Sequence, residues 1–130
     1  MAYKFQDRIK VPDKELNKKN IETLFSITGT FNINAIADFT ANNNMSYNVT
    51  DNTGKSVLHY IIGIDDITKK EDIRLYLIKY FIENGASVDT PDINNVTPLH
   101  LACKNQYYKI VEYLIQNGAV TDYPNSELMT

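Results

Sequence analysis

The stretch Asp92–Asp122 decides the fold of this chain: it reads Asp-Ile-Asn-Asn-Val-Thr-Pro-Leu-His-Leu-Ala-Cys-Lys-Asn-Gln-Tyr-Tyr-Lys-Ile-Val-Glu-Tyr-Leu-Ile-Gln-Asn-Gly-Ala-Val-Thr-Asp. The pattern predicts a turn, a short helix, a second helix and a stop at Gly118. Thr97 is a good N-cap and Pro98 a good first helical residue, because the proline ring fixes φ and needs no N–H there. We therefore expect one helix–turn–helix unit.

A second copy of this unit lies upstream. Gly118 follows Gly85 by 33 residues. At that offset, four apolar positions of the preceding helix match four others: Leu77, Ile78, Phe81 and Ile82 fall on Ile110, Val111, Leu114 and Ile115. The front halves, Asp51–His59 and Asp92–His100, match at an offset of 41 instead. The difference of eight places an insertion between His59 and Leu77.

The insertion is expected near Gly63–Asp72, which holds the acidic residues Asp65, Asp66, Glu71 and Asp72. Thr68 and Glu71 have the spacing of a capping box, which predicts that the second helix begins early, near Lys69. Two arrangements stay open here: a longer second helix, or an extra loop between the helices. The acidic residues lack the alternating pattern of a calcium-binding loop, so they predict a solvated surface.

A degenerate third copy appears at an offset of 41 upstream of Gly85, with Asn44 at the stop position. We expect its helices over residues 20–28, capped by Asn20, and over about 33–41. Two alternatives stay open for the residues before 20: a helix that starts at Pro12–Asp13 with Asp13 as its cap, or a flexible lead-in. The helix over about 33–41 would place Ile36, Ala37 and Ala41 on one face, and Thr40 stands where the next copy has Phe81. Asparagine suits the stop because it tolerates the left-handed conformation.

Thr-Pro-Leu-His, followed by Ile-Val-x-x-Leu-Ile-x-x-Gly-Ala and a 33-residue period, resembles the ankyrin repeat. The resemblance implies an all-α solenoid of stacked helix–turn–helix units joined by short hairpin turns. The predicted organisation is a polar lead-in and a single ankyrin-repeat domain, 1–19 and 20–130. Within the domain we expect a degenerate capping repeat, a repeat with the insertion at 63–72, a regular repeat and a C-terminal tail, over 20–50, 51–91, 92–123 and 124–130.

Composition excludes several functional classes. The chain has 130 residues, a net charge of −3 and no basic face, which argues against nucleic acid as a partner. Its apolar runs are shorter than the roughly 18 residues that span a membrane, and its start does not resemble a signal peptide. Cys103 is the single cysteine, so no disulfide can form within the chain. We expect Cys103 to be a small buried residue, and the protein to work in the cytoplasm.

The two histidines invite a catalytic or metal-binding interpretation, but His59 and His100 both fall in the Leu-His of the repeat motif. The resemblance implies that they make hydrogen bonds between hairpin and helix that hold adjacent repeats together. Neither cysteine, histidine nor carboxylate spacing indicates a metal site, and no nucleophile–base arrangement is present. The sequence predicts no catalytic residue, no metal and no cofactor.

Departures from the repeat motif predict local strain. Asn95 replaces the turn glycine, which is tolerable because asparagine visits positive φ. Gln106 replaces the glycine between the helices, which implies strain or a different turn.

The resemblance also implies a concave surface for other proteins, built from hairpin tips and first-helix faces. Carried over by position, the candidate partner-binding residues are Asn52, Thr53, Lys55, Ile64, Ile93, Asn94, Val96, Lys104, Asn105, Tyr107 and Tyr108. Ile93 and Val96 are the most informative of them, because an apolar hairpin tip is costly unless a partner or a neighbouring hairpin covers it.

The sequence therefore predicts a non-enzymatic protein–protein interaction module. The high content of Asn, Ile, Lys and Tyr is typical of AT-rich genomes, which suggests a viral or bacterial effector or inhibitor of a host protein. The alternative is a structural or assembly protein whose open C-terminal face stacks on a copy of itself or on a larger complex.

Overall fold

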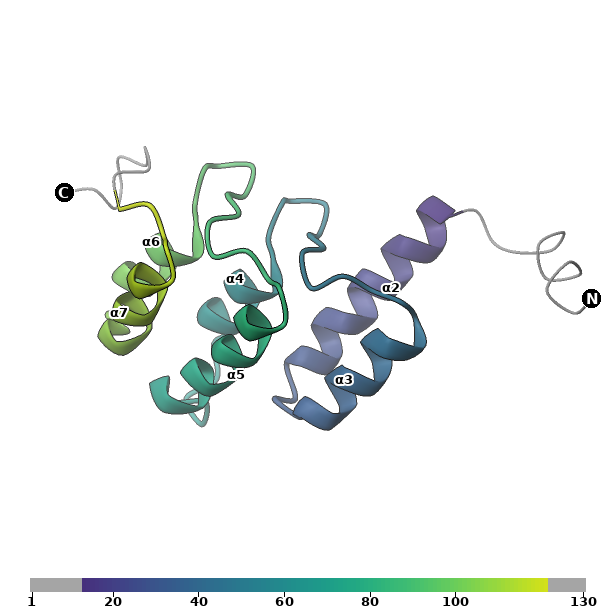
Figure 1. Ribbon diagram of the computed structural model, residues 1–130, viewed down its shortest axis with the longest axis horizontal. Coiled ribbons are helices and arrows are strands. Elements are labelled where there is room, and N and C mark those ends of the chain that lie inside the picture. Colours follow the sequence, from purple (N-terminus) through teal and green to yellow (C-terminus); the bar gives the residue numbers. More distant parts are fainter. Residues whose placement is uncertain (1–12, 122–130) are drawn as a thin grey trace, which may run out of the picture.

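Figure 1 shows the computed structural model, which describes residues 13–121, with side chains from residue 18 onward. The helices form three pairs that lie side by side: α2 (Asp13–Thr28) with α3 (Ile33–Asn42), α4 (Val57–Gly63) with α5 (Glu71–Glu83), and α6 (Pro98–Lys104) with α7 (Tyr108–Gln116). Extended strands are absent from the described residues, apart from one isolated bridge between Thr50 and Ser56. The predicted all-α repeat class is confirmed.

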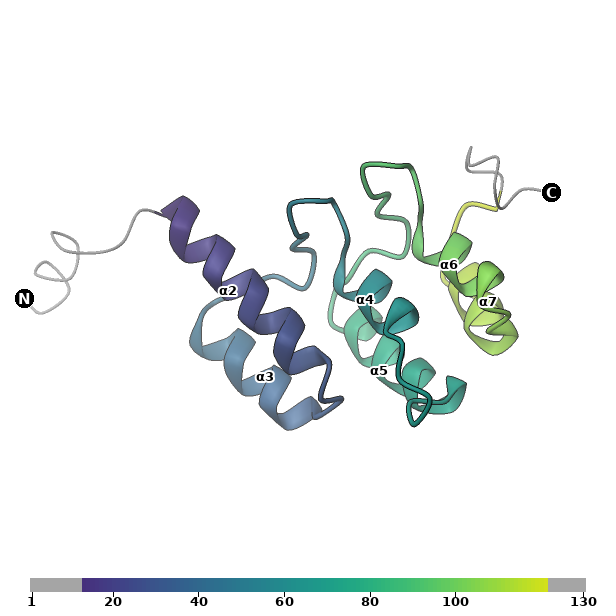
Figure 2. The same cartoon turned by 180° about the vertical axis from the view of Figure 1, so that it is seen from behind.

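The helices lie in two layers. The first helices of the pairs, α2, α4 and α6, form the layer nearer the viewer in Figure 2, and the second helices form the layer behind them. Two hairpins, at residues 50–56 and 91–97, extend from the same edge of the stack (Figures 1 and 2). The surface made by these hairpins and the outer sides of α2, α4 and α6 is called the first-helix face below.

The short first helices begin at matched capping boxes. The hydroxyls of Ser56 and Thr97 accept hydrogen bonds from the N–H groups of His59 and His100. In return, the Nδ1 atoms of the two histidines each accept from the N–H of their cap residue, at 3.0 Å. Histidine thus does the work that glutamate or glutamine does in the common capping box. The predicted Thr97 cap with Pro98 at the first turn is confirmed.

Left-handed residues end the second helices, as predicted. Gly85 and Gly118 follow α5 and α7 with φ of +103° and +96°, and Asn44 follows α3 with φ of +52°. Gln106 has φ of +62°, so the predicted strain between α6 and α7 is confirmed. Non-glycine residues in this region cost roughly 1–2 kcal/mol.

We predict that Gln106→Gly stabilises the fold by about 0.5–1 kcal/mol, because glycine adopts positive φ without a Cβ clash. The stabilisation is smaller than the strain that is removed, because glycine also gives the unfolded chain more conformational freedom. Urea unfolding at pH 7.5 measures this change. Gly85→Ala serves as the opposite case and should destabilise. A Gln106→Gly variant less stable than the natural chain would contradict the strain at this turn.

The N-terminal helix is longer than the predicted helix at 20–28 and includes the helix from Asp13 that the sequence left open. Helix α2 begins at Asp13, so Asn20 lies inside it and the prediction that Asn20 caps the helix is wrong. The predicted boundary between lead-in and repeat domain therefore falls within a helix. Apolar periodicity starts only at Ile21, but five of the eight residues 13–20 are Lys, Glu or Leu, which have high helix propensity and favour a longer helix.

The eight-residue insertion is divided equally between helix and loop. Helix α5 has 13 residues against nine in α7, and seven residues, 64–70, join α4 to α5 where three residues, 105–107, join α6 to α7. The predicted start near Lys69 through a Thr68 cap is wrong, since α5 begins at Glu71 without a side-chain cap. The Thr68 hydroxyl instead donates to the Asp66 carboxylate at 2.6 Å, within the loop.

The core runs continuously through the three pairs, and α6 contributes the buried residues Leu99 and Ala102 to it. The largest fully buried apolar side chains come from the other five helices: Leu24, Ile36, Leu58, Ile61, Ile62, Leu77, Ile78, Phe81, Ile110 and Leu114. Two predicted core positions are wrong. Ala41 is exposed, and the buried position of that turn is taken by Thr40, whose hydroxyl donates back to the Ile36 carbonyl at 2.9 Å. Cys103 is also exposed, and Ala102 is the small buried residue of α6.

Candidate interaction surface

Each hairpin folds around one aspartate. The Oδ1 of Asp51 accepts from the N–H groups of Thr53 and Lys55, at 2.8 and 3.0 Å. Asp92 repeats the arrangement with Asn94 and Val96 at the same two distances. Burial raises the pKa of the Asp51 carboxyl, but hydrogen bonds from Thr53 and Lys55 outweigh it and hold the pKa below its usual value. The carboxylates therefore fix the shape of both tips.

The two hairpins are also tied to each other. The N–H of Ile93 donates to the carbonyl of Thr53 at 3.0 Å. Gly54 permits this approach, because its φ is +82° and a Cβ there would lie 3.1 Å from backbone atoms of Asp92 and Ile93. The tips are thus a rigid pair rather than two independent turns.

His59 links the second repeat to the hairpin of the third. Its Nδ1 accepts from the Ser56 N–H, so its Nε2 carries the proton and donates to the Val96 carbonyl at 2.7 Å. The side chain is 2% exposed. The role that the resemblance implied for this histidine, a hydrogen bond between adjacent repeats, is what the geometry shows. Burial lowers the pKa of His59 below its ordinary 6.5, although the Val96 hydrogen bond opposes that shift.

This lowered pKa predicts acid sensitivity. As the pH falls, the unfolded chain protonates His59 at a higher pH than the folded chain does. The stabilisation of the fold by neutral His59 is therefore complete above pH 6.5 and is lost as the pH falls toward the lower pKa of the folded chain. We expect the urea midpoint to fall between pH 7.5 and 5, and to fall less in His59→Gln. His100→Gln is the control for the second histidine. An unchanged pH dependence in His59→Gln would contradict the assignment.

The predicted partner-binding residues separate into two groups. Seven have exposed side chains, of which six lie along the hairpins and at the end of α6 and Tyr108 begins α7: Asn52, Lys55, Ile93, Asn94, Lys104, Asn105 and Tyr108. Ile93 and Tyr108 are the apolar members of this group, with 71% and 67% exposure. The other four are half-buried and hold the scaffold at the edge of this surface: Thr53, Ile64, Val96 and Tyr107.

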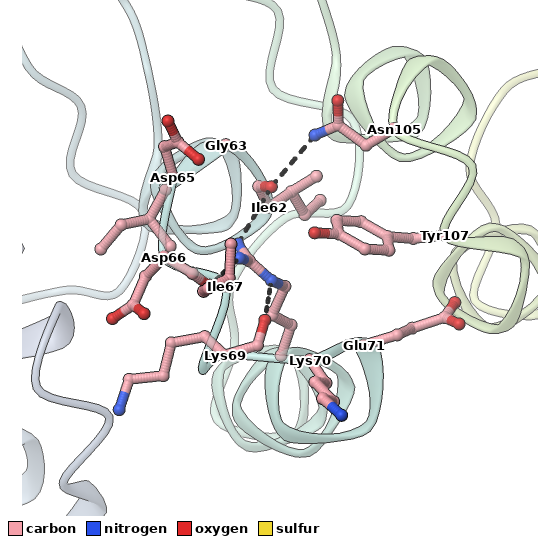
Figure 3. A pocket seen from close by; sticks show the side chains of 12 residues that line it. Ile62, Gly63, Asp65, Asp66, Ile67, Lys69, Lys70, Glu71, Asn105 and Tyr107 are labelled. Atoms are coloured by element: carbon pink, nitrogen blue, oxygen red, sulfur yellow. Dashed lines mark hydrogen bonds between the residues drawn. The ribbon is translucent and has the colours of Figure 1, made fainter.

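The insertion lines a pocket of about 560 Å³ at the C-terminal ends of α4 and α6, shown in Figure 3. Arg74 lies against its floor and is 2% exposed. Its guanidinium donates only to backbone carbonyls: Ile61 at 2.7 Å, Ile62 at 3.2 Å, Asp66 at 3.1 Å and Lys69 at 2.5 Å. The guanidinium also lies 5.2 Å from the centre of the Tyr107 ring. Arg74 therefore holds the insertion loop to the core.

The extra turn of α5 also fastens the second repeat to the third. The Glu71 carboxylate accepts from the N–H groups of Lys109 and Ile110, at 2.6 and 3.1 Å, so it caps α7, which has no side-chain cap of its own. Asp72 pairs with Lys109 at 3.1 Å on the exposed surface, where such a pair adds little. The Asn105 amide donates to the Ile62 carbonyl at 3.2 Å. Through the Glu71 contacts, the insertion therefore helps to hold the second repeat against the third.

Sequence reasoning missed Arg74, although a signal was present. Arg74 precedes Leu77 and Ile78 by three and four residues, so it shares their buried face.

Among the described residues, no group of three or more His, Cys, Asp or Glu lies close enough together to hold a metal ion. Likewise, none of the described helices is long and apolar enough to span a membrane.

The paired helices, hairpins and capping histidines together define an ankyrin-repeat protein. The family model described as "Ankyrin repeats (3 copies)" matches residues 30–125, so the chain belongs to this family. Members of the family are protein-interaction modules.

The chain is similar to a protein described as ankyrin repeat protein L484 of Acanthamoeba polyphaga mimivirus. The two are 30% identical over an alignment of 116 residues, and the match covers 83% of this chain and 6% of that protein. The chain thus spans only a small part of the length of this viral relative.

Proposed function

We propose that the chain is a non-enzymatic module that binds another protein through its first-helix face. The observation that carries the proposal is Ile93, an isoleucine with 71% exposure on a hairpin that is fixed by the Asp92 carboxylate and tied to the neighbouring hairpin. A rigid tip costs little conformational entropy on binding, and burying its apolar side chain is favourable. Lys55 and Asn94 would add contacts on the same face.

The partner we propose is a protein of the cell in which the chain acts. The viral relative supports a role as a viral effector or inhibitor that binds a host protein inside the infected cell. Affinity capture from host-cell extract, followed by mass spectrometry, identifies the partner for the measurements below.

We predict that Ile93→Asp weakens binding of the captured partner by about tenfold or more, because loss of a central apolar contact commonly costs over 1 kcal/mol and the new carboxylate must be desolvated. Ile115→Asp is the matched control: it makes the same change at an isoleucine with 45% exposure on α7. Isothermal titration calorimetry measures both. Equal affinities for the natural chain and Ile93→Asp would contradict binding through the first-helix face.

A second candidate function, stacking through the C-terminal face, rests on the repeat equivalence. Ile62 and Ile78 are 1% and 0% exposed because the third repeat covers them. Their counterparts in α6 and α7, Cys103 and Val111, are exposed and half-buried, with Ile115 beside them. This face offers the same kind of surface to a further helix pair, from a second copy or a larger complex.

Sedimentation velocity over a wide concentration range tests this second candidate. Self-stacking predicts a sedimentation coefficient that rises with concentration for the natural chain and stays constant for Ile115→Asp. A natural chain that stays monomeric at high concentration would argue against self-stacking and would leave binding through the first-helix face untouched.

A further inference from the structure

Helix α2 forms one side of a groove, together with the hairpin at 50–56 and α4. It has 16 residues where α4 and α6 have seven. Figure 2 shows that it continues past the end of α3 toward the level of the hairpin at 50–56. This groove of about 420 Å³ lies where α2 meets this hairpin and α4, and its lining residues are Ile21, Glu22, Phe25, Ser26, Asp51, Asn52 and Tyr60.

The floor of the groove is aromatic. The rings of Phe25 and Tyr60 lie 5.6 Å apart between centroids, tilted by 47°, and both side chains are half-buried. Gly29 makes this packing possible, because a Cβ at that position would lie 2.9 Å from the Tyr60 hydroxyl oxygen. The rings therefore offer an apolar surface that is fixed in place and still accessible from the groove.

The rim of the groove is acidic. Glu22 and Asp51 line it, and none of its lining residues is Lys, Arg or His. The Asp51 carboxylate already holds the hairpin turn. Glu22 is exposed and has no hydrogen-bond or ion-pair partner among the described residues. The nearest cations in sequence are Lys19 and Lys18, three and four residues before Glu22 on α2, and Lys55, whose charge interacts with Asp51. The groove thus presents one free carboxylate and one fixed carboxylate over two aromatic rings.

We propose that this groove binds an arginine side chain of the partner protein. A guanidinium group is planar and weakly hydrated, so it stacks on aromatic faces, and its forked N–H groups bind carboxylates in two parallel hydrogen bonds. Phe25 and Tyr60 supply the faces, Glu22 supplies the free carboxylate, and Asp51 adds negative potential. A lysine would gain the charge attraction but not the stacking, and an anionic ligand would be repelled by both carboxylates.

The inference rests on the proposed function and names the chemical group of the partner that the chain would bind. Its test needs no knowledge of the natural partner: a random dodecapeptide library, displayed on phage, is selected on the immobilised chain. Selected peptides are then synthesised and titrated against the natural chain, Glu22→Lys and Glu112→Lys. Glu112 is a matched control, since it is an exposed glutamate on α7, far from the groove in the fold. Each peptide is also made with citrulline, a neutral isostere, in place of its arginine.

We expect selected peptides to be enriched in arginine and to lose affinity by about tenfold with Glu22→Lys or with citrulline, as for loss of a charge-assisted hydrogen bond. Glu112→Lys should leave the affinity unchanged. Peptides that lack arginine enrichment, or that bind Glu22→Lys as tightly as the natural chain, would overturn the proposal. Sensitivity to Ile93→Asp without sensitivity to Glu22→Lys would refute the arginine groove alone, whereas the reverse result would refute the hairpin contact alone.

Discussion

Replacing Arg74 by alanine is expected to destabilise the fold by about 3 kcal/mol. The guanidinium is buried, and it donates to the carbonyls of Ile61, Ile62, Asp66 and Lys69. A buried carbonyl left without a donor costs roughly 1–3 kcal/mol. The full sum over four carbonyls is not expected, because Ile62 keeps its hydrogen bond from Asn105 and water can enter the open pocket.

Urea unfolding, followed by circular dichroism, measures the effect of Arg74→Ala. Lys18→Ala removes an exposed cation from α2 and should change stability by no more than about 0.5 kcal/mol. Arg74→Lys should recover only part of the loss, since lysine lacks the planar fork that serves several carbonyls at once. An Arg74→Ala chain as stable as the Lys18→Ala chain would show that the insertion loop does not depend on this side chain.

Replacing Phe81 by alanine is expected to cost about 3–5 kcal/mol, the range for removal of a large buried aromatic side chain. Phe81 is fully buried in α5, and its ring lies 5.0 Å from that of Tyr47 and 5.5 Å from that of Tyr80. The hydroxyls of Tyr47 and Tyr80 are 2.7 Å apart, which ties the first repeat to the second beside the Phe81 ring. Burial, with help from this hydrogen bond, raises the pKa of Tyr80 to about 12.

The third repeat suggests a milder substitution at Phe81 for comparison. The equivalent residue is Leu114 in the third repeat, and both residues are fully buried. Phe81→Leu should therefore cost much less than Phe81→Ala, about 1–1.5 kcal/mol, because it keeps most of the apolar volume. Thermal unfolding monitored by circular dichroism gives the order of the three chains. A Phe81→Ala chain within 1 kcal/mol of Phe81→Leu would mean that this site collapses around the missing ring and is not rigidly packed.

The sequence was sufficient for features set by local chemistry. The Thr97–Pro98 helix start, the left-handed stops at Asn44, Gly85 and Gly118, and the strained Gln106 follow from the preferences of single residues, and the structure confirms them. The repeat offsets of 33 and 41 residues also gave the number and order of helix pairs, because equivalent apolar positions recur in each copy.

Features set by contacts distant in sequence were not predicted. Glu71 begins α5 and at the same time caps α7, which is 38 residues away, so a local capping-box argument at Thr68 could not locate the helix start. Cys103 is exposed because the described residues place no further helix against it, a fact invisible in the repeat motif itself. The groove at Phe25 and Tyr60 is lined by residues of α2, the hairpin at 50–56 and α4, which only the tertiary packing brings together.

Hydrogen exchange of the chain with and without its captured partner tests most directly whether the partner binds the first-helix face. Binding there predicts slower exchange of backbone amides at both hairpin tips, 52–55 and 93–96, together with the exposed ends of α4 and α6. The backbone of α7 should exchange at the same rate in the free and bound chain. Slower exchange confined to α7 and the turn after it, with unchanged hairpin tips, would contradict the account and favour the C-terminal face as the binding surface.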